Sequence, residues 1–158
     1  KIQEYVHSLL KKYETKDSYL LDLYAGVGTF GIINSELFKE VYIVESDKNC
    51  IDAAKININN NKITNAKEIL LDAMKLKKLT LPNDLFVITD PPRSGMHPKT
   101  IEQLKNLKPK IMIYVSCNIE QLSKDLKKFS DYSIKSAALF DLFPQTPHIE
   151  AVIELVLT

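Results

Sequence analysis

The chain has 158 residues, and its 21 basic and 20 acidic side chains give a formal net charge of only +1. A chain of this length can bury a core without a disulfide or a metal, so we expect one domain over residues 1–158. A net charge this close to zero does not by itself indicate a nucleic-acid partner, so only local clusters of basic residues could attract one. These clusters contain Lys75, Lys77, Lys78, Lys105, Lys108 and Lys110.

The sequence carries no targeting or metal-binding signal. No apolar run approaches the roughly 20 residues that a membrane span needs, and the first residues lack the apolar segment of a signal peptide. Cys50 and Cys117 belong to no Cys-x-x-Cys pair or histidine cluster, so neither a zinc site nor a disulfide is predicted. We expect a cytoplasmic protein with no membrane and no metal partner. Because Lys1 stands where an initiator methionine would, we also expect the chain to be part of a longer protein.

The first predicted element is an amphipathic helix over residues 2–13, in which apolar side chains recur at Ile2, Val6, Leu9 and Leu10. Short apolar runs then alternate with helical patterns. Strands are predicted at residues 19–24, 41–45, 68–71, 85–89 and 111–116. Helices are predicted near residues 29–37, 48–60, 98–107 and 119–129. This alternation is typical of a doubly wound, mostly parallel sheet with right-handed crossovers.

The last part of the chain departs from this alternation. Residues 132–143 and 149–157 form two extended segments, joined by residues 144–148 without a helix between them. We expect the two segments to pair as an antiparallel hairpin. The predicted fold class is therefore α/β, with a mostly parallel twisted sheet and an antiparallel C-terminal hairpin at one edge.

A glycine-rich turn follows the first predicted strand. Gly26, Gly28 and Gly31 let the backbone approach a ligand closely, and the helix after them presents unpaired N–H groups. The spacing satisfies the Gly-x-Gly-x-x-Gly fingerprint of dinucleotide-binding folds, and Glu45 ends the next strand, where it can accept from two ribose hydroxyls. A nucleotide-like cofactor is therefore predicted at this turn.

Two cofactors, a nicotinamide dinucleotide and S-adenosylmethionine, compete for this turn. Asp22 favours S-adenosylmethionine, because a carboxylate near the strand end can hold the methionine ammonium group, a charge that a pyrophosphate ligand lacks. Asp72, which ends the third strand, can then accept from the adenine amino group. Helix N-capping is the alternative role for Asp22, Glu45 and Asp72, since all three stand at strand-to-helix turns.

An acidic-Pro-Pro loop and a cysteine follow two later strands. Asp90 precedes two prolines that fix an extended turn, which presents its carboxylate rigidly to a flat group. Cys117 ends another strand as either a small core side chain or a nucleophile. Glu150 opens the last extended segment as either a base or a charged residue that protects a sheet edge. Because ligands bind beyond the carboxyl ends of parallel strands, we expect Asp90 and Cys117 to share a rim with the cofactor residues.

These motifs resemble the catalytic domain of the S-adenosylmethionine-dependent RNA 5-methyluridine methyltransferases. The resemblance begins at about Asp22, runs to the C-terminus and is specific in its second half. It implies a Rossmann-like class I methyltransferase fold and transfer of a methyl group to carbon 5 of a uridine in tRNA or rRNA. The motifs that carry it are residues 22–30, residues 44–45, residues 90–95 (Asp-Pro-Pro-Arg-Ser-Gly), residues 114–118 (Tyr-Val-Ser-Cys-Asn) and residues 142–150.

The resemblance also implies a role for each site residue. Cys117 would be the nucleophile that adds to carbon 6 of uracil, and Glu150 the general base that removes the proton from carbon 5. Asp90 and Arg93 would contact the target base. The cofactor site would contain Asp22, Tyr24, Gly26, Gly28, Glu45, Asp72 and Asp90.

Members of this family carry a Phe-x-Gln-x-Asn segment before the opening helix and N-terminal domains that hold RNA. We expect these parts to lie outside the present sequence and the RNA grip to come from them. Three other functions stay open: an exocyclic-amine nucleobase methyltransferase, a nicotinamide-dependent oxidoreductase, and a cofactor-binding fragment that catalyses nothing by itself. Cys117 and Glu150 distinguish the uridine enzyme from the amine-modifying one, which needs no cysteine.

Overall fold

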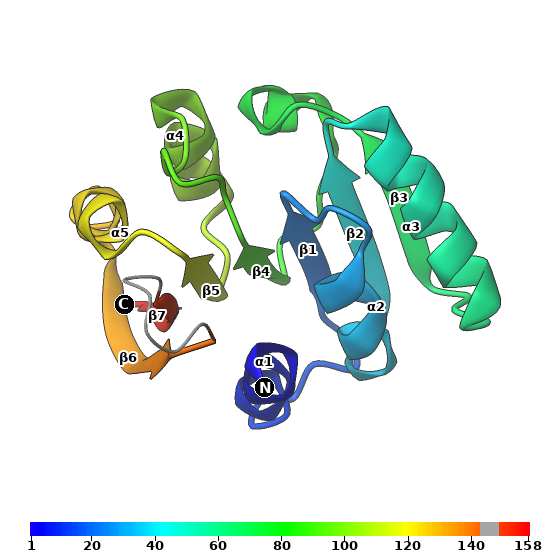
Figure 1. The fold of residues 1–158 in the computed structure, drawn as a ribbon, viewed down its shortest axis with the longest axis horizontal. Helices are drawn as coiled ribbons and strands as arrows, with labels where there is room; N and C mark the ends of the chain where they lie inside the picture. Colours follow the sequence, from blue (N-terminus) through cyan, green and yellow to red (C-terminus); the bar gives the residue numbers. More distant parts are fainter. Residues whose placement is uncertain (143–148) are drawn as a thin grey trace.

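The computed structural model describes residues 1–142 and 149–158 and contains one seven-stranded sheet with the order β3-β2-β1-β4-β5-β7-β6 (Figure 1). Strands β1 to β5 are parallel, and β7 runs antiparallel to both β5 and β6. The predicted α/β fold class and its antiparallel C-terminal hairpin are therefore confirmed. The strands are β1 (Tyr19–Leu23), β2 (Glu40–Glu45), β3 (Ala66–Leu70), β4 (Leu85–Thr89), β5 (Ile111–Ser116), β6 (Tyr132–Phe140) and β7 (Glu150–Leu157).

Helices cover both faces of the sheet. One hydrophobic core joins the sheet to α1, α2 and α3, and a second joins it to η2, α4 and α5 (Figure 1). Successive strand residues serve opposite cores, as Leu20 and Leu21 do, because side chains alternate across a strand. The helical elements are α1 (Ile2–Leu10), α2 (Thr29–Asn34), η1 (Ser35–Leu37), α3 (Lys48–Asn60), η2 (Ala73–Lys78), α4 (Pro98–Leu107) and α5 (Ile119–Leu126).

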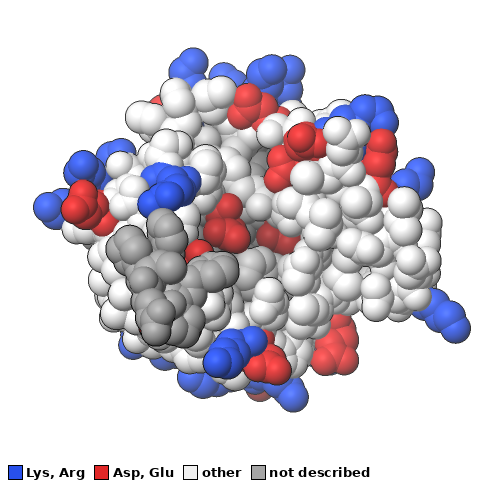
Figure 2. Space-filling view, viewed as in Figure 1, with Lys and Arg blue, Asp and Glu red and all other residues white. Residues whose placement is uncertain are grey.

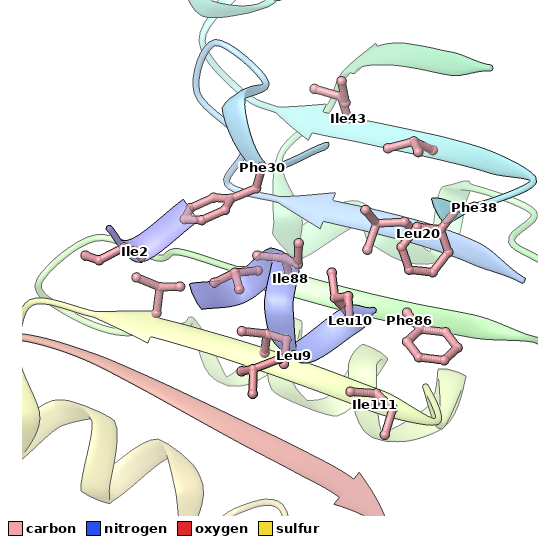
Figure 3. Close-up of a cluster of buried hydrophobic side chains, with 14 of the residues drawn as sticks. Ile2, Leu9, Leu10, Leu20, Phe30, Phe38, Ile43, Phe86, Ile88 and Ile111 are labelled. Carbon is pink, nitrogen blue, oxygen red and sulfur yellow. The ribbon is translucent and has the colours of Figure 1, made fainter. Parts of the chain in front are cut away.

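Figure 3 shows the first of these cores, which holds α1 against the sheet. Leu9 and Leu10 of α1 lie beside Ile88 of β4 and Ile111 of β5, and Phe30 of α2 extends the same cluster. All five side chains are buried. The apolar period of the opening helix therefore predicts its buried face correctly.

The C-terminal hairpin places β7 inside the sheet, between β5 and β6. Glu154 of β7 is only 1% exposed, and its carboxylate accepts hydrogen bonds from the hydroxyls of Tyr13 and Ser136. The helix α1 ends at Leu10, three residues before the predicted end, and Tyr13 leaves the helix to make this contact. The predicted turn at residues 144–148 lies outside the described residues.

Other elements also differ from the sequence prediction: the helix predicted near residues 29–37 is α2 followed by η1, α5 ends at Leu126, and β6 ends at Phe140. The short 3-10 helix η2 was not expected, because six residues with an irregular turn at Lys75 are too few to show a helical period. β3 begins at Ala66, two residues earlier than predicted, where Ala66 pairs with Val41 of β2. Within the described ranges, no helix combines the length and the apolar character needed to cross a bilayer.

Candidate active site

The glycine turn lies at the carboxyl end of β1 and leads into α2. Gly28, the N-cap of α2, has a φ of +83°, a left-handed conformation that other side chains rarely adopt. A Cβ atom at Gly28 would also lie 3.2 Å from Cδ1 of Ile43 in β2. A Cβ atom at Gly26 would meet nothing within 4 Å, so the backbone there faces open space. The turn therefore packs tightly onto the sheet at one end and leaves backbone accessible at the other.

Asp22 lies inside β1, one residue before its end, and is buried beneath the glycine turn with 1% of its surface exposed. Its Oδ2 accepts a hydrogen bond from the backbone N–H of Gly31 at 2.7 Å. Its Oδ1 is buried and has no hydrogen-bond partner among the described residues. Burial raises the pKa of this carboxyl to about 8, and the carboxylates of Asp90 and Glu45 act in the same direction. A cationic group bound at the turn would lower this pKa and ionise the carboxyl, and Oδ1 would then accept a hydrogen bond from that group.

The buried carboxyl of Asp22 makes the stability of the fold depend on pH. Because its folded-state pKa is about 8 rather than 3.8, the folded chain holds this proton more tightly than the unfolded chain. This contribution to stability is fully present below pH 3.8 and is lost as the pH rises through 8. Asp22→Asn removes the titration, so we expect a flatter stability profile, by up to ~1.4 kcal/mol per pH unit, in urea unfolding experiments.

Asp90→Asn is the matched control for this prediction. The pKa of Asp90 is raised to about 6, so its removal changes the stability profile mainly below pH 6. The interval from pH 6 to 8 therefore reports on Asp22. Parallel profiles for the wild type and Asp22→Asn over that interval would contradict the assignment.

Glu45 joins the end of β2 to the glycine turn. One carboxylate oxygen, Oε2, accepts from the backbone N–H of Gly26 at 3.0 Å. The other, Oε1, accepts from the backbone N–H groups of Ser46 at 2.6 Å and Asp47 at 3.0 Å. Three backbone donors thus hold this carboxylate in one orientation beside the accessible backbone of Gly26.

A hollow of about 360 Å³ lies between the ends of β1, β3 and β4. Tyr24 and Asp72 line it together with Pro92 of the acidic-Pro-Pro loop and His97, which precedes α4. Asp72 is the N-cap of η2, and its Oδ1 accepts from the backbone N–H of Met74 at 2.8 Å. The capping role considered for Asp72 is therefore confirmed, while its role toward a cofactor stays a prediction. The hollow brings predicted cofactor residues and the predicted substrate loop to one place.

The loop at residues 90–95 is joined to the turn that carries Cys117. Asn118 caps α5, accepting through Oδ1 from the backbone N–H of Gln121 at 3.2 Å. Its side-chain amide donates to the backbone carbonyl of Arg93 at 2.9 Å. Ser116 Oγ completes the turn by accepting from the backbone N–H of Asn118 at 3.1 Å. One side chain therefore sets the distance between the cysteine and the acidic-Pro-Pro loop. The guanidinium of Arg93 is exposed, and its role toward substrate stays a prediction.

The pairing of β5 with β7 brings Cys117 and Glu150 to the same edge of the sheet. Ser116 of β5 stands opposite Ala151 of β7 in this antiparallel pair. Cys117 follows Ser116 and Glu150 precedes Ala151, so each lies one residue beyond the pair in the same direction. Both side chains are half-buried. The two predicted catalytic residues, 33 positions apart in the sequence, are therefore neighbours across the strand ends.

Asp90 completes this group from the end of β4. Its side chain is exposed at the rim. Desolvation by the surrounding protein nevertheless raises its pKa to about 6, and the nearby Glu150 carboxylate adds to this increase. At neutral pH Asp90 is therefore mainly ionised and can accept a hydrogen bond. Figure 2 shows acidic side chains gathered in the hollow at the centre of this face. Among the described residues, no three His, Cys, Asp or Glu side chains form a group that could hold a metal ion.

Asp125 of α5 is a site residue that the sequence analysis missed. It is fully buried, and its Oδ2 accepts from the backbone N–H of Met96 at 2.9 Å and from the hydroxyl of Tyr114 at 2.8 Å. A Cβ atom at Gly95 would lie 2.5 Å from this oxygen, so the loop packs directly on the carboxylate. The sequence feature that could have indicated its burial is its position three residues after Leu122, on the apolar face of the helix. Asp125 ties the loop to β5 and α5 behind the cysteine.

Comparison with solved structures identifies the fold. The tRNA (uracil-54, C5)-methyltransferase of Pyrococcus abyssi, in complex with S-adenosyl-L-homocysteine, gives a TM-score of 0.79 at 34% identity and covers 94% of this chain and 37% of its own. An rRNA methylase from Streptococcus thermophilus gives a TM-score of 0.78 at 14% identity, over 97% of this chain and 94% of its own, and shares the fold. The chain therefore has the Rossmann-like fold of class I methyltransferases.

Sequence comparison gives the family. A family model described as tRNA (uracil-5-)-methyltransferase matches residues 1–157. The tRNA (uracil(54)-C(5))-methyltransferase of Pyrococcus abyssi is 37% identical over 137 residues, which are 87% of this chain and 33% of that protein. An uncharacterised RNA methyltransferase of Caldanaerobacter subterraneus is 36% identical over 154 residues, 94% of this chain and 34% of that protein. The chain belongs to the tRNA (uracil-5-)-methyltransferase family, and it spans about a third of the length of these curated relatives.

Proposed function

We propose that this chain is the methyl-transferring domain of an enzyme that methylates carbon 5 of a uridine in RNA through a covalent adduct with Cys117. The observation that carries the proposal is the meeting of Cys117, Glu150 and Asp90 at one rim, beside the glycine turn. Membership of the family supports it, and the names of the family and of the Pyrococcus abyssi relatives favour tRNA over rRNA.

The residues around the glycine turn fit S-adenosylmethionine as the cofactor. The buried Oδ1 of Asp22 has no partner among the described residues and suits the methionine ammonium group. The oriented carboxylate of Glu45 suits the ribose hydroxyls, and the hollow lined by Tyr24 and Asp72 suits the adenine. When bound, S-adenosylmethionine supplies a methyl group on a positively charged sulfur.

The chemistry assigns Cys117 and Glu150 to separate steps. Carbon 5 of uracil is a poor nucleophile until the Cys117 thiolate forms a bond to carbon 6, which moves an electron pair toward oxygen 4 and makes carbon 5 reactive. After carbon 5 has taken the methyl group, Glu150 removes the remaining carbon-5 proton. The sulfur–carbon 6 bond then breaks and returns the thiolate. The Asp90 carboxylate would accept from N3–H of the ring throughout.

Two measurements test this function. In calorimetric titration, S-adenosyl-L-homocysteine should bind the chain, and NAD should not compete with it. Glu45→Ala should lower the affinity about 10- to 100-fold, because it removes charged hydrogen bonds worth roughly 1.5–3 kcal/mol. Glu14→Ala, at an exposed glutamate, is the matched control and should change nothing.

Nucleoside analysis of RNA treated with the longest protein that contains this sequence should detect 5-methyluridine. Base methylation on an exocyclic nitrogen instead would show that the amine-modifying alternative is correct. Tighter binding of NAD than of S-adenosyl-L-homocysteine would overturn the cofactor assignment.

A further inference from the structure

A second hollow, of about 520 Å³, lies between η2 and α4 on the outside of the cofactor site. It is lined by Lys75 and Lys77 of η2, by Lys99 and Glu102 of α4 and by Met74, among others. We call it the η2–α4 groove. Both of its walls begin at the carboxyl edge of the sheet, because η2 follows β3 and α4 follows the loop after β4. One end of the groove therefore lies near the edge of the sheet that carries Asp90.

The charge of the chain is unevenly distributed around this groove. Residues 73–108 carry seven basic and three acidic side chains, although the whole chain has a net charge of only +1. Figure 2 shows basic side chains along the top of the view, where η2 and α4 lie in Figure 1. Residues 73–108 therefore have a net charge of +4, against −3 for the remainder of the chain.

The lysines of the groove are available to a ligand. Lys75, Lys77 and Lys99 are exposed, and none forms an ion pair with a carboxylate of the described residues. Some surface lysines elsewhere are paired, such as Lys67 with Glu40 at 2.9 Å, and others, such as Lys11, are not paired with any described carboxylate. Unpaired lysines along one groove attract a polyanion more strongly than lysines neutralised by neighbours.

Gln103 of α4 gives the groove a defined shape. Its side-chain amide donates to the backbone carbonyls of Met74 at 2.9 Å and Lys99 at 2.7 Å. Its Oε1 accepts from the backbone N–H of Lys77 at 2.6 Å. The two walls are thus joined by one side chain, and the lysines of both walls line the same groove.

Met74 connects this groove to the candidate active site. It lines both the η2–α4 groove and the hollow that contains Tyr24, Asp72 and Pro92. With the cofactor's adenine in that hollow, an RNA strand that places one base beside the acidic-Pro-Pro loop can lead its neighbouring phosphates past the adenine toward the groove. The 37% exposed thioether of Met74 offers an apolar contact to a ribose or base on that path.

We propose that the η2–α4 groove binds the phosphate backbone of the RNA substrate next to the target nucleotide. The proposal rests on the proposed function, since it takes RNA as the substrate. A third hollow, lined by Lys11 and Lys16, lies before β1 near the opposite edge of the sheet and also contains Glu14, Asp17 and Asp84. Three carboxylates outnumber the two lysines of that hollow, whereas three lysines outnumber the one carboxylate, Glu102, of the groove, so that hollow supplies a matched control.

The test compares two triple variants of the longest protein that contains this sequence. Lys75→Gln, Lys77→Gln and Lys99→Gln together remove the groove's charge, and Lys11→Gln, Lys12→Gln and Lys16→Gln remove the same charge from the control region. Fluorescence anisotropy measures the affinity of each for a labelled RNA stem-loop between about 50 and 200 mM salt. The groove variant should bind about tenfold more weakly at low salt. Its slope of log affinity against log salt should be smaller by about 3, one for each lost phosphate contact.

Titration with S-adenosyl-L-homocysteine accompanies each RNA measurement and separates two kinds of failure. A groove variant that keeps cofactor affinity and loses RNA affinity supports the proposal. Equal losses in the two triple variants, or an unchanged RNA affinity of the groove variant, would overturn it while leaving cofactor binding intact. Loss of cofactor binding by the wild type would instead count against the proposed function.

Discussion

Glu150→Gln is expected to accumulate a covalent enzyme–RNA complex that already carries the transferred methyl group, whereas Cys117→Ala is expected to form no complex. The difference follows from the two steps assigned to these neighbours at the ends of β5 and β7. Without the thiolate, carbon 5 is never activated, so transfer should be undetectable. Without the base, addition and transfer proceed but the sulfur cannot leave, and turnover should fall by about 10²- to 10⁴-fold.

A denaturing gel with RNA and a labelled methyl donor measures both outcomes, in the longest protein that contains this sequence. The retarded band should carry label in Glu150→Gln and be absent in Cys117→Ala. Cys50→Ala is the matched control for the cysteine, since Cys50 is also half-buried but lies on α3. Glu14→Gln, at an exposed glutamate, is the matched control for Glu150→Gln. Normal turnover by Cys117→Ala would eliminate the covalent mechanism, and product release by Glu150→Gln at the wild-type rate would assign the base elsewhere.

The recurrence of apolar residues along the sequence predicted the strands of the sheet well, because this recurrence depends only on residues that are close in sequence. The observed bounds of β4 and β5 coincide with the predicted strands at residues 85–89 and 111–116. Parallel βαβ order then puts all the strand ends at one edge, which is why Asp90 and Cys117 could be assigned to one rim before their distance was known.

The position of β7 could not be predicted in the same way. The sequence indicated a hairpin at an edge, and either of its strands satisfies that pattern. In the structure β6 forms the edge and β7 lies inside the sheet. The edge-protecting role considered for Glu150 is therefore wrong, and its strand instead lies against β5, where Cys117 follows.

Contacts between residues that are far apart in the sequence also could not be predicted from it. Asn118 reaches Arg93 across 25 positions, and Asp125 reaches the backbone of Met96 across 29. Helical periodicity assigns a residue to a face, but it does not say which polar group the opposite surface presents there. An aspartate on an apolar helix face indicates a structural role only when the buried hydrogen-bond donors that face it are known.

Removing the buried Asp125 carboxylate is expected to destabilise the chain more than removing any exposed carboxylate. Asp125→Ala leaves the N–H of Met96 and the hydroxyl of Tyr114 buried without their acceptor. We expect a loss of about 3 kcal/mol in the free energy of unfolding, which corresponds to a fall in Tm of roughly 6–12 °C. Thermal and urea unfolding measure both quantities.

Asp52→Ala is the matched control, because Asp52 is also a helical aspartate near a lysine but is exposed. Its loss should change the unfolding free energy by less than about 0.5 kcal/mol. Because Asp125 also holds the loop beside Cys117, folded Asp125→Ala at low temperature should form the covalent RNA complex more slowly and still bind S-adenosyl-L-homocysteine normally. An Asp125→Ala chain as stable as Asp52→Ala would show that the loop does not depend on this carboxylate.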